Sequence, residues 1–506
     1  MLSRLIIHPF LIGVAPILFL WSQNRAEMSF SQVYQPAALV LVAVAVILLI
    51  GRRAGGKLSK LGLCVSLVLL LFLSFGHLTQ ILIEVGLNGF EPEIAGALSL
   101  LICVVVAVAV VKSRRSLRGA TAGLNIASIA FVVLQLIQAA DASASQSSLD
   151  KPLLPLTPAT ATGEETPDIF YILVDGYGRQ DVLHDLYDLD NAEFIGYLRE
   201  NGFYVADSSH ANYGQTLLSL SSALYCDYLQ DLWELYRYDR DRSGLLAQLP
   251  DNPVQAQLKA NGYEFWSFAT GSEITEFPEA DHYLEPRGSL SEFENLLVSL
   301  TPLPYLLSDS VSQYGAHRRR INFVFDSLGR LEPTDRPKFV FAHILAPHPP
   351  FVFGADGKAI DPDRPFALHD GNGFEAIGGT QAEYVAGYRA QAAYITARLQ
   401  EMVRGLLDNY SATPPVIMLQ SDHGPGSRTQ WNLAALTDIR ERFGILNAYL
   451  LPEGADSLLH PSISPVNSFR VLLNSCFGAD LELLPDSAYY SPFQYPYDFE
   501  NVTERL

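Results

Sequence analysis

The chain has 506 residues, of which 49% are hydrophobic, and its mean hydropathy is +0.16. This composition is too apolar for a soluble enzyme of such length, so a membrane portion is expected. The formal net charge of −20 at pH 7 disfavours binding to nucleic acid and to anionic surfaces.

Five apolar runs in the first 140 residues each approach the length that crosses a hydrocarbon core of about 30 Å. They cover residues 5–22, 36–51, 61–83, 95–111 and 122–140. The first run is not a signal peptide, because no small-residue cleavage site follows it and four more runs come after it. The sequence therefore predicts a transmembrane domain of five helices at residues 1–140.

Basic residues cluster on one side of these predicted spans. That side carries Arg4, Arg52, Arg53, Lys57, Lys60, Lys112, Arg114, Arg115 and Arg118, whereas the opposite loops carry only Arg25. Loops rich in Lys and Arg between membrane spans stay on the cytoplasmic side. We therefore expect a multi-pass protein of the inner (plasma) membrane with a cytoplasmic amino terminus. With an odd number of spans, everything after about residue 140 is expected to be periplasmic or otherwise extracytoplasmic.

Residues 141–167 are rich in Ala, Ser, Thr and Pro and are predicted to be a linker, which leaves 168–506 as one outer α/β domain. Ten Lys or Arg and six Asp or Glu lie in the first 150 residues, so 24 basic and 48 acidic side chains lie beyond them. This outer charge again excludes nucleic acid as a partner. Cys226 and Cys476 lie outside the spans and either pair or remain free thiols.

Acidic residues follow two predicted strands of the outer domain. In "PDIFYILVDGYGR", the strand Ile169 to Val174 ends at Asp175, and in "PPVIMLQSDHGPGS" a buried strand ends before Asp422 and His423. Ligands bind at the carboxyl ends of strands in open α/β sheets, where two acids can share one cation. Taken alone, the pair could equally be structural, with Asp422 capping a turn and His423 filling space in the core.

Two further segments carry candidate chemical groups. In "SSHANYGQTLLSLSSALY", Thr216 begins a helical pattern, either as a capping residue or as a nucleophile stabilised by a metal and the helix dipole. In "KFVFAHILAPHPPFVF", a strand at Phe339 to Phe341 is followed by His343 and His348. Both imidazoles are candidates for metal or oxyanion binding, His348 being the stronger.

This ordered set of residues resembles the alkaline phosphatase superfamily. The similarity is to its sulfatase-like, membrane-anchored branch, which includes lipoteichoic acid synthase and the lipid A phosphoethanolamine transferases. It covers roughly residues 167–490 and is carried by "SDHG" and by the Thr of "NYGQTLLSL". It implies an α/β/α outer domain with a mostly parallel central sheet, following the five-helix bundle.

The resemblance implies a site for one divalent metal, held by Asp175, Thr216, Asp422 and His423. These mixed oxygen and nitrogen ligands fit Zn²⁺ or Mn²⁺, with Mg²⁺ possible. The transferases usually place Glu where this chain has Asp175, which leaves the choice of metal open.

The resemblance also implies catalytic roles. Thr216 would be the nucleophile that forms a phospho-threonine intermediate, and His348 would bind a phosphoryl oxygen or protonate the leaving group. The substrate-binding candidates are His348, His343, His210 and Asn212.

We therefore expect a phosphotransferase or phosphodiesterase that moves a phospholipid head group, phosphoglycerol or phosphoethanolamine, to an envelope glycan or to water. One alternative is a tethered phosphatase or sulfatase-like hydrolase of a soluble ester, although the C/S-x-P-x-R motif of true sulfatases does not occur. Another is an inactive envelope binding or assembly protein, which the presence of Thr216 beside the predicted ligands disfavours.

Overall fold

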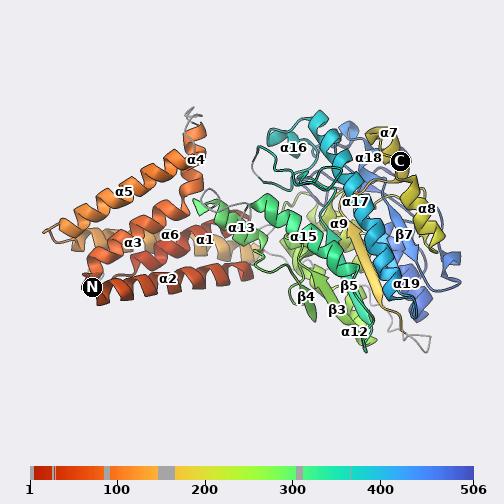
Figure 1. Cartoon of the computed structure of the whole chain (residues 1–506), viewed down its shortest axis with the longest axis horizontal. Helices are drawn as coiled ribbons and strands as arrows, with labels where there is room; N and C mark the ends of the chain where they lie inside the picture. Colours follow the sequence, from red (N-terminus) through yellow and green to blue (C-terminus); the bar gives the residue numbers. More distant parts are fainter. Residues whose placement is uncertain are drawn as a thin grey trace. The chain divides into compact units, whose positions relative to one another are not determined.

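The computed structural model describes residues 5–24, 28, 30–84, 92–145, 166–303, 312–364 and 366–506 (Figure 1). The chain divides into two compact units. The first contains Met1–Ser148 and Leu290–Gly315, and the second contains Leu149–Ser289 and Ala316–Leu506.

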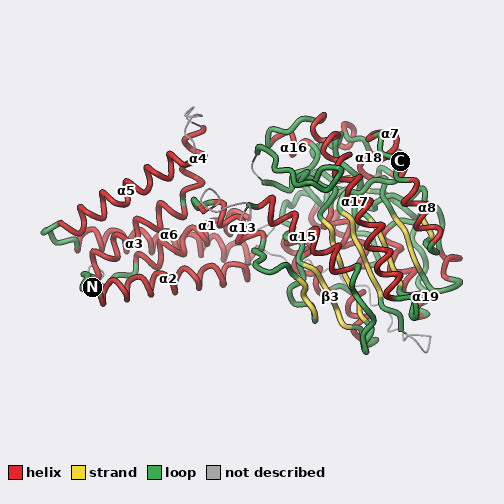
Figure 2. Tube along the Cα trace, in the orientation of Figure 1, coloured by secondary structure: helices red, strands yellow, loops and turns green. Residues whose placement is uncertain are grey.

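The first unit contains helices and no strand among its described residues (Figure 2). These helices are α1 (His8–Asn24), α2 (Tyr34–Arg53), α3 (Leu58–Leu73), α4 (Phe75–Glu84), α5 (Pro92–Lys112), α6 (Arg118–Ser145) and α13 (Glu292–Ser299). In the part of the chain that the structure describes, three helical stretches are long and apolar enough to cross a membrane: Phe30–Arg53, Ile94–Lys112 and Arg118–Gln138.

The expectation of five spans is therefore confirmed only in part. Helix α1 has 17 residues, and the predicted span at 61–83 is divided between α3 and α4. The break is at Ser74, whose backbone dihedrals (φ −114°, ψ 11°) leave the helical region. Most of the predicted linker, residues 146–165, lies outside the described residues, while α6 continues to Ser145.

A segment from beyond the expected linker belongs to the first unit. Phe293 of α13 is fully buried in a cluster with Trp21 of α1 and with Val33. The amide of Gly76 also donates a hydrogen bond to the carbonyl oxygen of Leu300 (2.9 Å). Apolar burial thus places Leu290–Gly315 with the membrane helices rather than with the rest of the predicted outer domain.

The second unit is built on a seven-stranded sheet in the order β2-β7-β6-β1-β5-β3-β4. The strands are β1 (Ile169–Val174), β2 (Tyr204–Val205), β3 (Glu264–Phe268), β4 (His282–Leu284), β5 (Lys338–Ile344), β6 (Val416–Gln420) and β7 (Asn447–Leu450). All pairs are parallel except those of β7, which runs antiparallel to β6 and β2. This is the mostly parallel α/β sheet expected from the sequence. A two-stranded sheet pairs β8 (Tyr489–Tyr490) with β9 (Glu500–Asn501).

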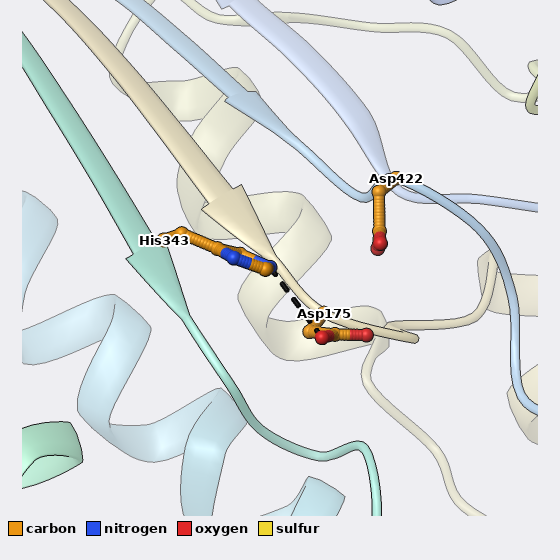
Figure 3. A group of neighbouring side chains, drawn as sticks. All are labelled: Asp175, His343 and Asp422. Atoms are coloured by element: carbon orange, nitrogen blue, oxygen red, sulfur yellow. Dashed lines mark ion pairs between the residues drawn. The ribbon is translucent and has the colours of Figure 1, made fainter. Parts of the chain in front are cut away.

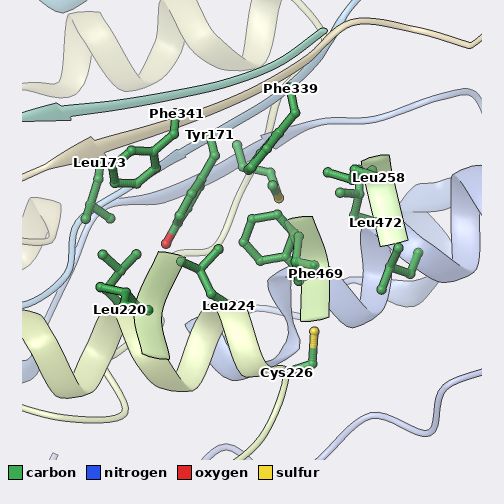
Figure 4. Close-up of a cluster of buried hydrophobic side chains, with 14 of the residues drawn as sticks. Tyr171, Leu173, Leu220, Leu224, Cys226, Leu258, Phe339, Phe341, Phe469 and Leu472 are labelled. Atoms are coloured by element: carbon green, nitrogen blue, oxygen red, sulfur yellow. The ribbon is translucent and has the colours of Figure 1, made fainter. Parts of the chain in front are cut away.

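Helices cover both faces of the seven-stranded sheet. The helices of this unit are α7 (Gln180–Tyr187), α8 (Ala192–Glu200), α9 (Thr216–Tyr225), α10 (Gln230–Tyr236), α11 (Ser243–Gln248), α12 (Pro253–Ala260), α15 (Gln313–Leu328), α16 (Asn372–Ala376), α17 (Gln381–Asn409), α18 (Ile439–Phe443) and α19 (Ser468–Phe477). On one face, Tyr171 of β1 and Phe341 of β5 pack in a core with Leu224 of α9 and Phe469 of α19 (Figure 4). On the other face, Phe170 of β1 meets Tyr410 at the end of α17.

The central position of β1 determines where the site lies. Because β1 pairs in parallel with both β5 and β6, the carboxyl ends of all three strands meet at one edge of the sheet. In this register Leu173 lies opposite both His343 and Gln420. The strand at Ile169–Val174 and the helix start at Thr216 are as predicted.

Candidate active site

Three ionisable side chains converge at the carboxyl edge of the sheet. Asp175 follows β1, His343 lies one residue before the end of β5, and Asp422 follows β6. One ligand atom from each lies within 4.8 Å of the other two, and the side chains point toward one another (Figure 3). His343 Nε2 is 3.5 Å from Asp175 Oδ2. This spacing suits coordination of a single ion.

The donor atoms of this group fit a divalent cation. Asp175 Oδ1, Asp422 Oδ2 and His343 Nε2 are buried and have no hydrogen-bond partner among the described residues. Two carboxylates and an imidazole lone pair left unpaired in a dry site are costly, and a cation compensates that cost. The residues present therefore satisfy the chemistry of a metal site.

The electrostatics of the two carboxyls differ. Burial, followed by repulsion from Asp422 and Asp370, raises the pKa of Asp175 well above its ordinary value. Burial also acts to raise the pKa of Asp422, but the neighbouring His423 and His343 outweigh it and lower that pKa. A bound cation is expected to hold both carboxyls in their ionised form.

Both imidazoles at this edge are in the state that binds metals. Burial lowers the pKa of His343 to about 4, and burial followed by repulsion from Arg442 lowers the pKa of His423 to about 4. The rings are therefore neutral at pH 7, and each offers a lone pair.

His423 connects the carboxylates to the predicted nucleophile. Its Nε2 lies 3.2 Å from Asp422 Oδ2, 3.6 Å from Asp175 Oδ1 and 3.2 Å from Thr216 Oγ1. Thr216 begins α9, so its hydroxyl also lies at the positive end of the helix dipole. The structure thus brings together all four residues predicted to hold the metal. It adds His343, which the sequence offered as a candidate for metal or oxyanion binding weaker than His348, and which was also predicted to bind substrate.

His348 borders this group. Its ring centroid is 6.0 Å from that of His423, and its amide donates to the carbonyl oxygen of Asp175 (3.1 Å). The Nδ1 atom lies 2.7 Å from the carbonyl oxygen of Pro349, so it carries the hydrogen and donates. The other ring nitrogen, Nε2, lies 3.7 Å from Asp370 Oδ2.

Asp370 and Arg442 were not predicted from the sequence. Burial acts to raise the pKa of Asp370, but the adjacent Arg442 guanidinium holds that pKa below its ordinary value. Arg442 is only 2% exposed, and its Nε donates to the carbonyl oxygen of Gly214 (2.9 Å), two residues before Thr216. It also donates to the carbonyl oxygen of Gly424 (3.2 Å), the residue after His423. The only sequence signal for Asp370 was its position in a Gly- and Asp-rich loop.

Two other predicted substrate-binding residues have different contacts. Asn212 Nδ2 donates to Ser464 Oγ (2.9 Å), and its Oδ1 accepts from the amide of Val466 (2.8 Å). His210 is buried and forms an isolated backbone bridge with Gly444. No contact found for either residue in the described part of the chain reaches the carboxylate group.

Comparison with protein-family models and with curated proteins found no match. Among solved structures, the chain is similar to the zinc complex of the periplasmic domain of EptC from Escherichia coli, at 12% identity and a TM-score of 0.41. That match covers 68% of this chain and 96% of EptC's domain. The integral membrane lipooligosaccharide phosphoethanolamine transferase A of Neisseria meningitidis matches over 94% of this chain and 95% of its own, at 13% identity and a TM-score of 0.38. A phosphonate monoester hydrolase of Agrobacterium radiobacter matches over 64% of this chain and 80% of its own, at 13% identity and a TM-score of 0.39.

Proposed function

We propose that this chain is a membrane-anchored, metal-dependent phosphotransferase that moves a phospholipid head group to an envelope acceptor through a phospho-threonine intermediate. The observation that carries the proposal is that Asp175 and Asp422 are buried together, each with a carboxylate oxygen that has no hydrogen-bond partner among the described residues. His423 Nε2, which lies beside both carboxylates, is 3.2 Å from the Thr216 hydroxyl. The motif resemblance and the apolar amino-terminal helices support a lipid as the donor. Phosphoglycerol and phosphoethanolamine are the head groups that we propose.

Asp175, Asp422, His423 and Thr216 would hold the cation, for which Zn²⁺ or Mn²⁺ fits the mixed oxygen and nitrogen atoms and Mg²⁺ is a third choice. When bound, it supplies Lewis acidity that lowers the pKa of the hydroxyl and neutralises charge on the phosphoryl oxygens. Thr216 is partly exposed, whereas both carboxylates are at most 4% exposed. The nucleophile is therefore the member of this set that a substrate can reach.

In the first step, Thr216 Oγ1, having lost its proton to solvent, attacks the phosphorus of the phosphodiester. An Oγ1–P bond forms and the P–O bond to the diacylglycerol breaks. His348 enters this step with a hydrogen on Nε2 as well as on Nδ1, and it gives the Nε2 proton to the departing oxygen while Nδ1–H stays bonded to the Pro349 carbonyl. In the second step, an acceptor hydroxyl gives its proton back to His348 and attacks phosphorus, which releases Thr216. Water in place of the acceptor gives hydrolysis.

We also propose a multi-pass inner-membrane protein with a cytoplasmic amino terminus and an extracytoplasmic catalytic unit, from the distribution of Lys and Arg. A reporter that is active only outside the cytoplasm, fused after residue 150, tests this orientation. An active cytoplasmic reporter fused there excludes it.

Thr216→Ala tests the reaction. The full-length protein in detergent is given a phospholipid with a labelled head group, and release of diacylglycerol is measured by mass spectrometry. Loss of the nucleophile should lower turnover by about 10³-fold or more. Thr437→Val is the matched control, because it removes a buried hydroxyl that bonds to the backbone of Gln430 and Leu433 and not to the carboxylate group. Wild-type turnover in Thr216→Ala contradicts the proposal, and cleavage of soluble esters without cleavage of lipid identifies a tethered hydrolase.

A further inference from the structure

A chain of hydrogen bonds lies behind His343, on the side away from Asp175. His343 Nδ1 is 2.9 Å from Thr275 Oγ1, which donates to Thr270 Oγ1 (3.1 Å). Thr270 Oγ1 in turn donates to Glu276 Oε2 (2.9 Å). The ring and both threonines are at most 3% exposed, so these bonds form out of contact with water.

The direction of this chain determines which ring nitrogen of His343 carries the hydrogen. Thr270 Oγ1 has two acceptors within reach, Glu276 Oε2 and the carbonyl oxygen of Ser272, so its single hydrogen points away from Thr275 in either case. Thr275 gives its own hydrogen to Thr270, and its oxygen therefore accepts from His343 Nδ1–H. In a neutral imidazole protonated at Nδ1, the lone pair is on Nε2.

Glu276 holds the far end of the chain in place. Its Oε2 also accepts from the amides of Thr270 (3.0 Å) and Gly271 (2.9 Å). Gly271 has a φ of +81°, and a Cβ there would lie 2.6 Å from the Arg320 guanidinium, so the loop requires glycine. The Glu276 carboxylate that orients the two threonines is thus held in place by backbone amides of the loop.

The Nε2 lone pair of His343 therefore faces Asp175 Oδ2, 3.5 Å away, and the ring has no hydrogen to donate to that oxygen. A lone pair held against a buried, ionised carboxylate is repulsive unless a proton or a metal cation lies between them, and only a metal cation keeps Asp175 and Asp422 ionised together. We propose that His343 is a ligand of the cation shared by Asp175 and Asp422, and that Glu276, Thr270 and Thr275 are positioning residues that hold its Nε2 toward that cation. This inference rests on the proposed function, which requires a cation at this site, and it adds a ligand to the site of that function. With His423, the site offers two imidazoles, which favours Zn²⁺ over Mg²⁺.

Binding of Co²⁺ to the full-length, metal-free protein in detergent tests the inference without any substrate. Affinity is measured by calorimetry and the ligand set by the visible absorption of Co²⁺. Thr275→Val keeps the shape of the side chain but removes the hydroxyl, and it should weaken binding by about 10- to 100-fold. Thr275→Ser restores the acceptor and should restore affinity. His343→Ala should both weaken binding and change the absorption spectrum, whereas Thr437→Val should do neither.

Wild-type affinity in both Thr275→Val and His343→Ala would overturn the inference, as would absence of Co²⁺ binding by the wild-type protein. An unchanged spectrum in His343→Ala would identify the ring as a hydrogen-bond donor to Asp175 and would also overturn it. If the wild-type protein binds Co²⁺ with the expected variant effects but releases no diacylglycerol, the proposed function fails while the ligand assignment stands. Thermal unfolding of each variant shows whether it is folded, and the affinity and spectrum of His343→Ala keep the test decisive if Thr275→Val does not fold.

Discussion

Removing the Arg442 side chain should expose how the site is held together. Arg442→Met keeps most of the side-chain volume but leaves the buried carboxylate of Asp370 without its ion-pair partner. It also removes the hydrogen bonds that Arg442 donates to the carbonyl oxygens of Gly214, two residues before Thr216, and of Gly424, the residue after His423. Breaking one side of a buried ion pair costs about 3–5 kcal/mol, because the remaining charge is uncompensated.

The second unit should show this loss as a lower midpoint of thermal unfolding. With an unfolding entropy of roughly 2.1 cal/mol/K per residue over this unit of roughly 330 residues, the midpoint should fall by about 4–7 °C. The assay is differential scanning fluorimetry of the full-length protein in detergent. Arg440→Met is the matched control on the same helix, because the Arg440 side chain is 40% exposed and its ion pairs with Asp181 and Asp185 are screened by solvent.

The double variant Arg442→Met/Asp370→Asn separates the charge from the packing. The amide introduced at position 370 still accepts the hydrogen bond from the Tyr384 hydroxyl but carries no charge, so the double variant should be more stable than Arg442→Met alone. A midpoint in Arg442→Met within about 1 °C of wild type would refute the reasoning, since the entropy above makes that shift smaller than 1 kcal/mol. A double variant no more stable than Arg442→Met would show that Asp370 is not the uncompensated group.

Two further predictions concern buried titratable groups. Burial raises the pKa of Glu441 to about 7 from an ordinary value of 4.5, so the folded protein holds a proton there that the unfolded chain releases. The stabilisation from this proton is complete below about pH 4.5 and is lost as the pH rises to about 7. Glu441→Gln stays neutral, so its unfolding midpoint should rise relative to that of the wild type between about pH 5 and pH 7.5. Unfolding midpoints of the two proteins that change in parallel with pH would contradict this. Burial also raises the pKa of the Cys226 thiol to about 12, and neither Cys226 nor Cys476 is in a disulfide bond. Iodoacetamide at about pH 8 should therefore leave Cys226 unmodified in the folded protein and alkylate it after denaturation. Peptide mass spectrometry measures the modification, and labelling of Cys226 in the folded protein would show that the thiol is not buried.

The positions of Asp175 and Thr216 were predictable because each depends on local sequence. An apolar run that stops at an acidic residue before glycine marks the end of a strand, and β1 ends at Val174 as expected. Glycine shortly before Thr216, followed by an apolar helical pattern, marks the start of α9. The membrane spans were harder to predict, because hydropathy counts apolar residues but does not detect the break at Ser74 that divides one span into α3 and α4.

The sequence by itself determined a membrane-associated chain, a mostly parallel α/β unit, and acids at the ends of two strands. Only the tertiary structure decided that His343 belongs with those acids, because the parallel pairing of β1 and β5 sets its register against Leu173. The ion pair of Asp370 with Arg442 likewise joins residues 72 apart in the chain, and no local pattern identifies either one. Periodicity reports which face of an element is buried, whereas the partners of a buried charge are chosen by strand order and loop packing, which depend on contacts distant in sequence.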